Sequence, residues 1–188
     1  MPAIIQTISK PLHPRALDSS GNNNHGTAYT GQALEFDGVA DNITITAQTF
    51  SGDFTYSFWY YNASGTPYVS GNASTDYVQF SSTTNILLKM ENTSYNITID
   101  ALSTATWYRI VLTRSGSTIS SYVNGVASGT VSSSDDFIIG YLGVRNNDYF
   151  TNALSGMLSD VQLWDTTWSA SDALYDYNNP EKLVLKNP

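Results

Sequence analysis

The segment from Trp107 to Val126 constrains the fold of this chain most strongly, because it combines strand-like alternation with two tight turns. Asn124 and Gly125 form the dipeptide best suited to a two-residue type I′ turn, in which both residues need positive φ. The first strand of the segment is apolar on both faces, as a strand in the middle of a packed sheet would be. The segment therefore predicts two consecutive hairpins, the first turning at residues 114–117, within an antiparallel sheet.

Composition agrees with a β-protein of one domain. The chain has 188 residues, of which 41% are hydrophobic, and no shift in composition marks a second domain. Charged residues make up only 13% and aromatic residues another 13%, a balance typical of β-structure with polar loops. The expected fold class is all-β.

Further strand patterns recur at a spacing of about 8–12 residues, which is typical of a sandwich or barrel. In the segment 53–61, Phe54, Tyr56, Phe58 and Tyr60 share one face. The segments 32–37 and 42–46 alternate around Gly38 and are expected to pair as a hairpin. The remaining strands are expected at 3–8, 67–70, 76–80, 86–90, 95–99, 136–142 and 153–164.

A short helix is expected near the C-terminus. Ser169 and Asp172 match a capping box, in which each side chain satisfies a free backbone donor of the first turn. The stripe expected to face the protein consists of Ala170, Ala173, Leu174 and Tyr177. We therefore expect an N-terminal arm or edge strand at 1–17, a sandwich at 18–180 and a tail at 181–188.

Charge and cysteine content exclude several classes of function. A net charge of −8 and a pI near 4.4 argue against nucleic-acid and anionic-membrane partners, which attract basic surfaces. The absence of cysteine excludes disulfides, thiolate metal sites and a cysteine nucleophile. No signal peptide or transmembrane segment is expected, because no apolar run is long enough.

Five segments together resemble the laminin G-like jelly rolls of the concanavalin A-like lectin/glucanase superfamily, over Asp18 to Pro180. They are DSSGNNNHG at 18–26, ALEFDG at 33–38, FTYSFWYY at 54–61, TWYRIVLTRSGSTISSYVNG at 106–125 and SGMLSDVQLWDTTWSASDALYDYNNP at 155–180. The resemblance implies a two-sheet antiparallel β-sandwich. Such domains occur in lectins, polysaccharide-binding modules, glycosidase accessory domains, adhesins and viral structural proteins, so the fold alone does not select a function.

The resemblance also implies a structural Ca²⁺, which many family members hold between the loop matching 18–24 and the strand matching Asp160. Carboxylate, amide and carbonyl oxygens are the ligands that Ca²⁺ prefers. The ligands carried over are Asp18, Asn22, Asn24 and Asp160. The alternative is that Asp18 and the asparagines only stabilise a turn.

Sugar binding is expected at loop aromatics that lie beside planar polar groups, since aromatic faces and amide or carboxylate groups together hold sugars. The candidates are Tyr68, Tyr141, Asn146, Asn147, Asp148 and Tyr149; the alternative is that each tyrosine is an ordinary surface residue. Trp59 and Trp107 are expected to pack in the core instead. Trp164 and Trp168 are expected to clamp the helix.

No catalytic residue is expected. A glycosidase of this superfamily needs a cluster of carboxylates along one strand, one of them with a raised pKa. Glu35 and Asp37 form only a fragment of such a cluster, without a third acid.

The resulting hypothesis is a non-enzymatic, surface-displayed module with a lectin-like or adhesive role. The ending YNNPEKL at 177–183 resembles the endings of such domains in marine phage structural proteins, which implies a capsid-decoration or tail-associated protein. Expected partners are glycans and other virion proteins, with self-association left open, at a virion surface or outside the cell after lysis. The alternatives are a purely structural virion subunit and, third, a polysaccharide-degrading glucanase.

Overall fold

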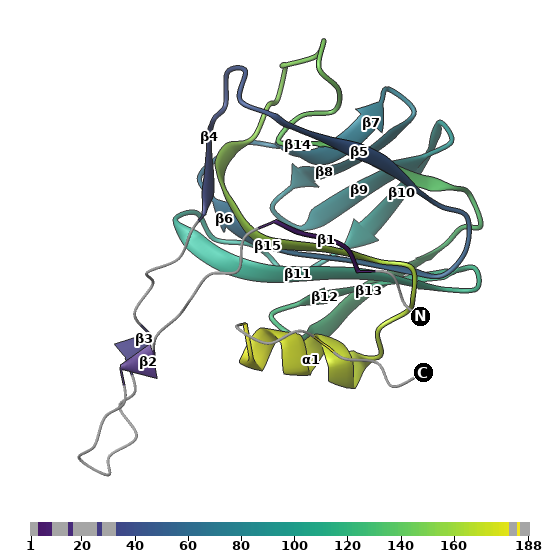
Figure 1. Ribbon diagram of the computed structural model, residues 1–188. Helices are drawn as coiled ribbons and strands as arrows, with labels where there is room; N and C mark the ends of the chain where they lie inside the picture. Colours follow the sequence, from purple (N-terminus) through teal and green to yellow (C-terminus); the bar gives the residue numbers. More distant parts are fainter. Residues whose placement is uncertain (1–3, 9–14, 17–25, 28–32, 181–183, 185–188) are drawn as a thin grey trace.

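The computed structural model describes residues 4–8, 15–16, 26–27, 33–180 and 184 (Figure 1). Its strands are β1 Ile4–Ile8, β2 Arg15–Ala16, β3 Gly26–Thr27, β4 Leu34–Asp37, β5 Ile43–Phe50, β6 Phe54–Asn62, β7 Tyr68–Ala73, β8 Asp76–Ser82, β9 Asn85–Met90, β10 Thr93–Thr98, β11 Thr106–Ser115, β12 Thr118–Val123, β13 Val126–Ser132, β14 Phe137–Leu142 and β15 Ser155–Trp164. The helix α1 runs over Ala170–Asn178. Among the described residues, no helix has the length and hydrophobicity needed to cross a membrane.

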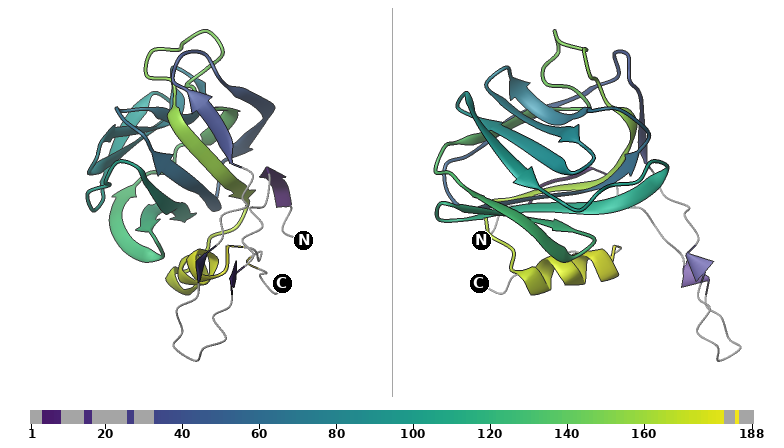
Figure 2. Two further views of the ribbon diagram at one scale, coloured as in Figure 1. Left: turned by 90° about the vertical axis from the view of Figure 1, so that its left-hand side faces the viewer. Right: turned by 180° about the vertical axis from the view of Figure 1, so that it is seen from behind.

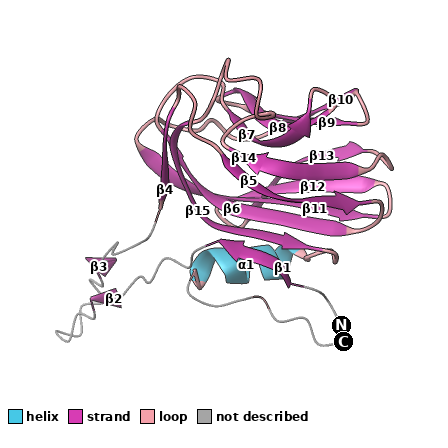
Figure 3. Ribbon diagram, turned by 45° about the horizontal axis from the view of Figure 1, so that its top comes forward, coloured by secondary structure: helices cyan, strands magenta, loops and turns pink. Residues whose placement is uncertain are grey.

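Two antiparallel sheets face each other across the core (Figure 3). The helix-side sheet has seven described strands in the order β1-β15-β6-β11-β12-β13, with β4 also pairing with β15. The loop-side sheet has six described strands in the order β10-β9-β8-β7-β14-β5. The predicted β-sandwich with one short C-terminal helix is confirmed.

The two hairpins predicted around β12 are also confirmed. β11 pairs with β12 and β12 with β13, and only Asn124 and Gly125 separate the last two strands. Their φ angles are 52° and 78°, the left-handed values that a type I′ turn requires. Local turn chemistry was therefore sufficient to predict this register.

The hairpin predicted around Gly38 is wrong. β4 pairs with β15 in the helix-side sheet, whereas β5 pairs with β14 in the loop-side sheet. Residues 38–42 therefore cross from one sheet to the other. The crossing turn is held by the Asp37 carboxylate, which accepts hydrogen bonds from the Val39 amide at 2.7 Å and the Ala40 amide at 3.3 Å. Alternation predicts that a segment is a strand and which face it buries, but it does not identify the strand's partner.

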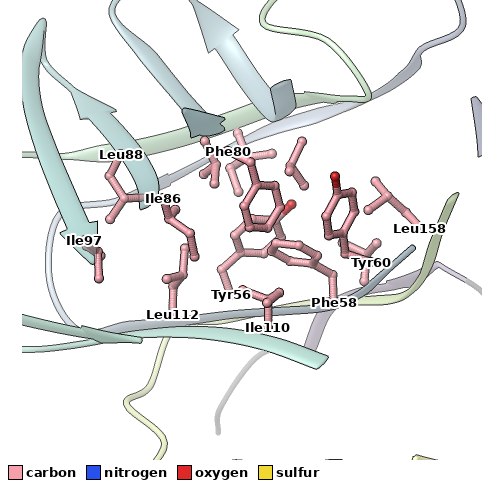
Figure 4. Close-up of a cluster of buried hydrophobic side chains, with 14 of the residues drawn as sticks. Tyr56, Phe58, Tyr60, Phe80, Ile86, Leu88, Ile97, Ile110, Leu112 and Leu158 are labelled. Carbon is pink, nitrogen blue, oxygen red and sulfur yellow. The ribbon is translucent and has the colours of Figure 1, made fainter. Parts of the chain in front are cut away.

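The core between the sheets is rich in aromatic residues (Figure 4). Phe54, Tyr56, Phe58 and Tyr60 of β6 are all buried on one face, as the alternation predicts. The ring of Tyr60 stacks on Phe80 of the opposite sheet with 4.5 Å between the ring centroids. The same face of β11 adds Ile110 and Leu112, while β9 supplies Ile86 and Leu88.

The helix α1 begins as predicted, with Ser169 and Asp172 forming a complete capping box. It covers the outer face of the helix-side sheet, at the opposite end of the molecule from the loop after β14 (Figure 2). Trp164 and Trp168 pack with their ring centroids 5.7 Å apart in a second apolar cluster under the helix, which also contains Ala173. The predicted clamp is confirmed.

The predicted buried stripe of the helix is partly wrong. Ala173 is fully buried, but Leu174 is 46% exposed and Ala170 is exposed. The buried position one turn after Ala173 is taken by Asp176, whose carboxylate receives hydrogen bonds from Arg109. An ion pair therefore acts together with the apolar contact of Ala173 to set which side of the helix faces the sheet.

The prediction that Trp59 and Trp107 pack in the core is wrong, because both are half-buried and lie outside the main core. The ring of Trp59 lies 5.9 Å from that of Tyr177 on the helix, and the ring of Trp107 lies 5.4 Å from that of Tyr61. Both belong to central strands, but alternation places them on the face that points away from the opposite sheet.

Candidate functional site: a tyrosine–arginine cluster beneath the loop after β14

Residues 143–154, here called the Arg145 loop, connect β14 to β15 and rise above the loop-side sheet (Figure 1). Backbone hydrogen bonds fix the loop at its base. The Gly143 amide donates to the Val69 carbonyl at 2.8 Å, and the Leu154 amide donates to the Gly143 carbonyl at 2.7 Å. The Tyr68 amide donates to the Asn152 carbonyl at 2.9 Å. Both ends of the loop are thus joined to one another or to β7.

Gly71 in β7 allows the loop to lie directly on the sheet. A Cβ atom at this position would lie 2.3 Å from the carbonyl oxygen of Arg145, a distance that non-bonded atoms do not reach. Any side chain here would therefore push the loop backbone away. The glycine fixes where Arg145 and the residues after it lie relative to β7 and β8.

Three tyrosines and one arginine meet where the loop crosses the sheet; we call them the tyrosine–arginine cluster. Tyr68 of β7 makes edge-to-face contacts with Tyr77 of β8 and with Tyr149 of the loop, at centroid separations of 5.0 and 6.0 Å. The Arg145 guanidinium carbon lies 3.7 Å from the ring centroid of Tyr149 and 5.8 Å from that of Tyr68. The ammonium of Lys89 lies 5.8 Å from the ring centroid of Tyr77.

The cluster has a buried base and an accessible rim. Tyr68 and Tyr77 are only 6% and 9% exposed, so they support the loop and do not present ring faces to solvent. Arg145 and Tyr149 are half-buried, and Phe150 is 37% exposed. Two further rim residues, Asn147 and Asp148, are exposed.

Two polar atoms of the loop are buried without a hydrogen-bond partner in the described structure. They are Nε of Arg145 and Oδ1 of Asn146. A buried polar atom that lacks a partner costs free energy unless water or a ligand satisfies it. A backbone bridge between Asn146 and Tyr149 closes the loop at this point.

The buried tyrosines keep their hydroxyl protons at neutral pH. Burial raises the pKa of both Tyr68 and Tyr77, whereas the nearby Arg145 guanidinium acts in the opposite direction on each pKa. The cluster therefore offers neutral phenol groups beside a positive charge.

The structure brings five of the six predicted sugar-binding residues together: Tyr68, Asn146, Asn147, Asp148 and Tyr149. Tyr141 lies on the adjacent β14, where its Cα is opposite Gly71. Three residues at the site were not predicted from the sequence: Arg145, Tyr77 and Phe150. Arg145 and Phe150 flank the predicted polar run directly, so a wider window would have included them. Tyr77 enters the site only through the pairing of β7 with β8.

Of the predicted calcium ligands, Asp18, Asn22 and Asn24 lie outside the described residues. Asp160 is described and is 2% exposed. Its Oδ2 lies 3.3 Å from Nη2 of Arg109 and accepts a hydrogen bond from Gln162 at 2.9 Å. A Ca²⁺ ion there would compete with the guanidinium for one carboxylate. The described part of the chain holds no group of three or more His, Cys, Asp or Glu arranged for a metal.

Asp37, which was considered with Glu35 as a fragment of a catalytic carboxylate cluster, stabilises a turn in the structure. The Asp37 carboxylate caps the crossing turn, and its hydrogen bond from the Val39 amide lowers its pKa. A general acid needs the opposite shift of pKa.

One family model matches most of the chain. The family model described as the concanavalin A-like lectin/glucanases superfamily, Laminin_G_3, matches residues 36–173. No curated protein matches the chain.

Similar solved structures share the fold at low sequence identity. A native heptameric SAP-like pentraxin from Limulus polyphemus is 17% identical, with a TM-score of 0.59 over 77% of this chain and 81% of the pentraxin chain. Domain 4 of an extracellular arabinanase from Geobacillus stearothermophilus, solved in complex with arabinotriose, is 13% identical, with a TM-score of 0.59 over 79% and 77% of the two chains. A sialidase from Trypanosoma rangeli is 13% identical, with a TM-score of 0.60 over 92% of this chain but only 36% of the sialidase.

Proposed function

We propose, from the premise that this chain belongs to the concanavalin A-like lectin/glucanases superfamily, that it is a non-enzymatic module that binds glycans at the rim of the tyrosine–arginine cluster. One observation carries the proposal. The Arg145 loop holds a guanidinium stacked on Tyr149, and the exposed residues Asn147, Asp148 and Phe150 belong to the same loop.

The rim has the chemistry that sugar recognition requires. Sugars are held by aromatic surface together with planar groups that donate and accept hydrogen bonds in fixed directions. Tyr149 and Phe150 supply the aromatic surface, and Asn147 and Asp148 supply exposed planar groups.

The relatives support the same class of ligand. The arabinanase domain that shares the fold was solved with arabinotriose, so this architecture holds an oligosaccharide in at least one of the similar structures. The lectin and glucanase members that name the superfamily act on carbohydrates. The location of the site on this chain rests on the Arg145 loop alone.

We propose that the chain catalyses nothing. Asp37, one of the two acids in the only fragment of a catalytic carboxylate cluster, stabilises a turn and has a lowered pKa. Incubation with laminarin, agarose and bacterial polysaccharides should release no reducing ends. Release that is lost in Glu35→Gln and kept in Asp18→Ala would overturn this part of the proposal.

For its biological setting we propose display on a phage particle, as a capsid-decoration or tail-associated protein. The support is the resemblance of residues 177–183 to the ends of marine phage structural proteins. Many displayed copies would amplify a weak affinity of each site for repeated surface glycans. Purified native particles should contain the chain by mass spectrometry; particles that lack it would contradict this setting.

The test of glycan binding is a glycan array probed with three proteins. The wild type should bind a defined group of glycans. Tyr149→Ala should lose that binding, because the substitution removes both an aromatic ring of the rim and the stacking partner of the Arg145 guanidinium. Tyr175→Ala is the matched control, since Tyr175 is 43% exposed on α1, far from the loop. A wild type that binds no glycan would favour the alternative of a purely structural subunit.

A further inference from the structure

We infer that the glycan is acidic and that the Arg145 guanidinium pairs with a carboxylate or sulfate group of the sugar. This inference rests on the proposed function and specifies its ligand class. It is based on where the positive charges of the sandwich lie, and on the stacking of the Arg145 guanidinium on Tyr149 without a carboxylate partner among the described residues.

Positive charge is scarce in this part of the chain. Residues 33–180 contain four basic side chains, at Lys89, Arg109, Arg114 and Arg145, within a protein of net charge −8. Two of them have structural partners. Arg109 pairs with Asp160 and Asp176, and Arg114 donates to the backbone carbonyls of Gly52, Phe50 and Asp135.

The other two basic side chains converge on the tyrosine–arginine cluster. Arg145 stacks on Tyr149, and Lys89 approaches Tyr77 from the neighbouring strand. Within the described residues, no carboxylate lies within ion-pair distance of either. Asp76, the buried acid of β8, the strand beside that of Lys89, instead accepts hydrogen bonds from the Thr75 hydroxyl and the Glu91 amide.

The geometry of Arg145 suits recognition of an anion. A guanidinium stacked on an aromatic ring is held in one plane, so its edge can donate two parallel hydrogen bonds to a carboxylate or sulfate at little entropic cost. The exposed Asp148 at the rim repels anions and limits where the charged group of the sugar can sit.

Isothermal titration calorimetry tests the inference with polygalacturonate and dextran sulfate as acidic probes, and dextran and laminarin as neutral ones. The wild type should bind an acidic probe at least about tenfold more tightly than the neutral ones, and this affinity should fall with added salt. In Arg145→Gln the affinity for the acidic probe should fall about tenfold or more. The loss of affinity in Arg145→Lys and in Lys89→Gln should be smaller than in Arg145→Gln.

Ser134→Asp is the control matched for charge. It lowers the net charge by one, as Arg145→Gln does, but at an exposed position at the opposite end of β14. Its affinity should equal that of the wild type, and thermal melting should show that all variants fold. Equal binding of neutral and acidic probes, or equal losses in Arg145→Gln and Ser134→Asp, would overturn the acidic ligand and leave glycan binding intact. Binding to no probe and to no array glycan would overturn both proposals.

Discussion

Arg109 is the residue whose role the sequence pattern could not reveal. It lies in the middle of β11, where alternation points it away from the core, yet it is fully buried under α1. Its guanidinium donates to both oxygens of Asp176, to the hydroxyl of Ser57 and to the carbonyl of Asp160. A fully satisfied network of this kind specifies one orientation of the helix.

Removing the acidic partner should be costly. Asp176→Ala removes a carboxylate that neutralises and hydrogen-bonds the buried Arg109 guanidinium. The free energy of unfolding should therefore fall by about 3 kcal/mol, the size of loss seen when one member of a buried ion pair is removed. Urea denaturation measures the change, with Asp165→Ala as a matched control at an exposed position. A loss in Asp176→Ala no larger than in Asp165→Ala would contradict this account.

At the scale of elements, sequence patterns predicted most strands and the helix start. Period-two alternation identifies β6 and β11, the Asn-Gly pair fixes the turn before β13, and the capping box fixes the start of α1. These signals depend on residues close together in the sequence, so they do not require knowledge of the tertiary contacts. The partner of β4 could not be predicted, because pairing between distant strands depends on the closure of the whole sandwich.

The candidate site was predictable only in part for the same reason. Tyr149 and Asn146 belong to a polar loop that the sequence singles out, so they were predicted. Their contact with Tyr77 requires the register of β7 on β8 and the close approach of the loop at Gly71. Neither feature leaves a signature within a short window.

Gly71 provides a test of how the loop is held. In Gly71→Ala the new Cβ would overlap the Arg145 carbonyl, so the loop must shift; we expect about 1–3 kcal/mol of destabilisation and a loss of glycan binding. Gly52→Ala is the control, because no atom lies within 4 Å of its added Cβ, and its stability should change by less than about 0.5 kcal/mol. Unfolding in urea and calorimetric titration measure the two effects. Wild-type binding in Gly71→Ala would contradict the account of the loop.

At the scale of the whole molecule, α1 and the Arg145 loop lie at opposite ends of the sandwich (Figure 2). The buried Arg109 network lies at one end, and the proposed glycan site lies at the other. This separation means that variants of the helix and variants of the loop should affect stability and binding independently.

The calcium ion stays a prediction, and it also concerns the whole molecule. Millimolar Ca²⁺ should raise the melting temperature relative to EDTA, since a ligand that binds only the folded state adds about 2.7 kcal/mol at a hundredfold excess over its Kd. Asp18→Ala should abolish the shift, because it removes the side-chain oxygens, whereas Asp165→Ala should keep it. Asp160 is a poor choice for the test, because its substitution also disturbs Arg109. Equal melting temperatures with Ca²⁺ and EDTA, in protein shown to be metal-free, would contradict the site.

The central claim is that the Arg145 loop binds a glycan, and NMR titration tests it most directly because shift mapping detects weak binding and locates it. The oligosaccharide that binds best on the array is titrated into ¹⁵N-labelled protein, and the amide shifts are followed residue by residue. The account predicts shifts that concentrate in residues 143–154 and near Tyr68 and Tyr77, with α1 unchanged. Saturable shifts confined to α1, to the exposed β13 or to any other surface away from the loop would contradict it.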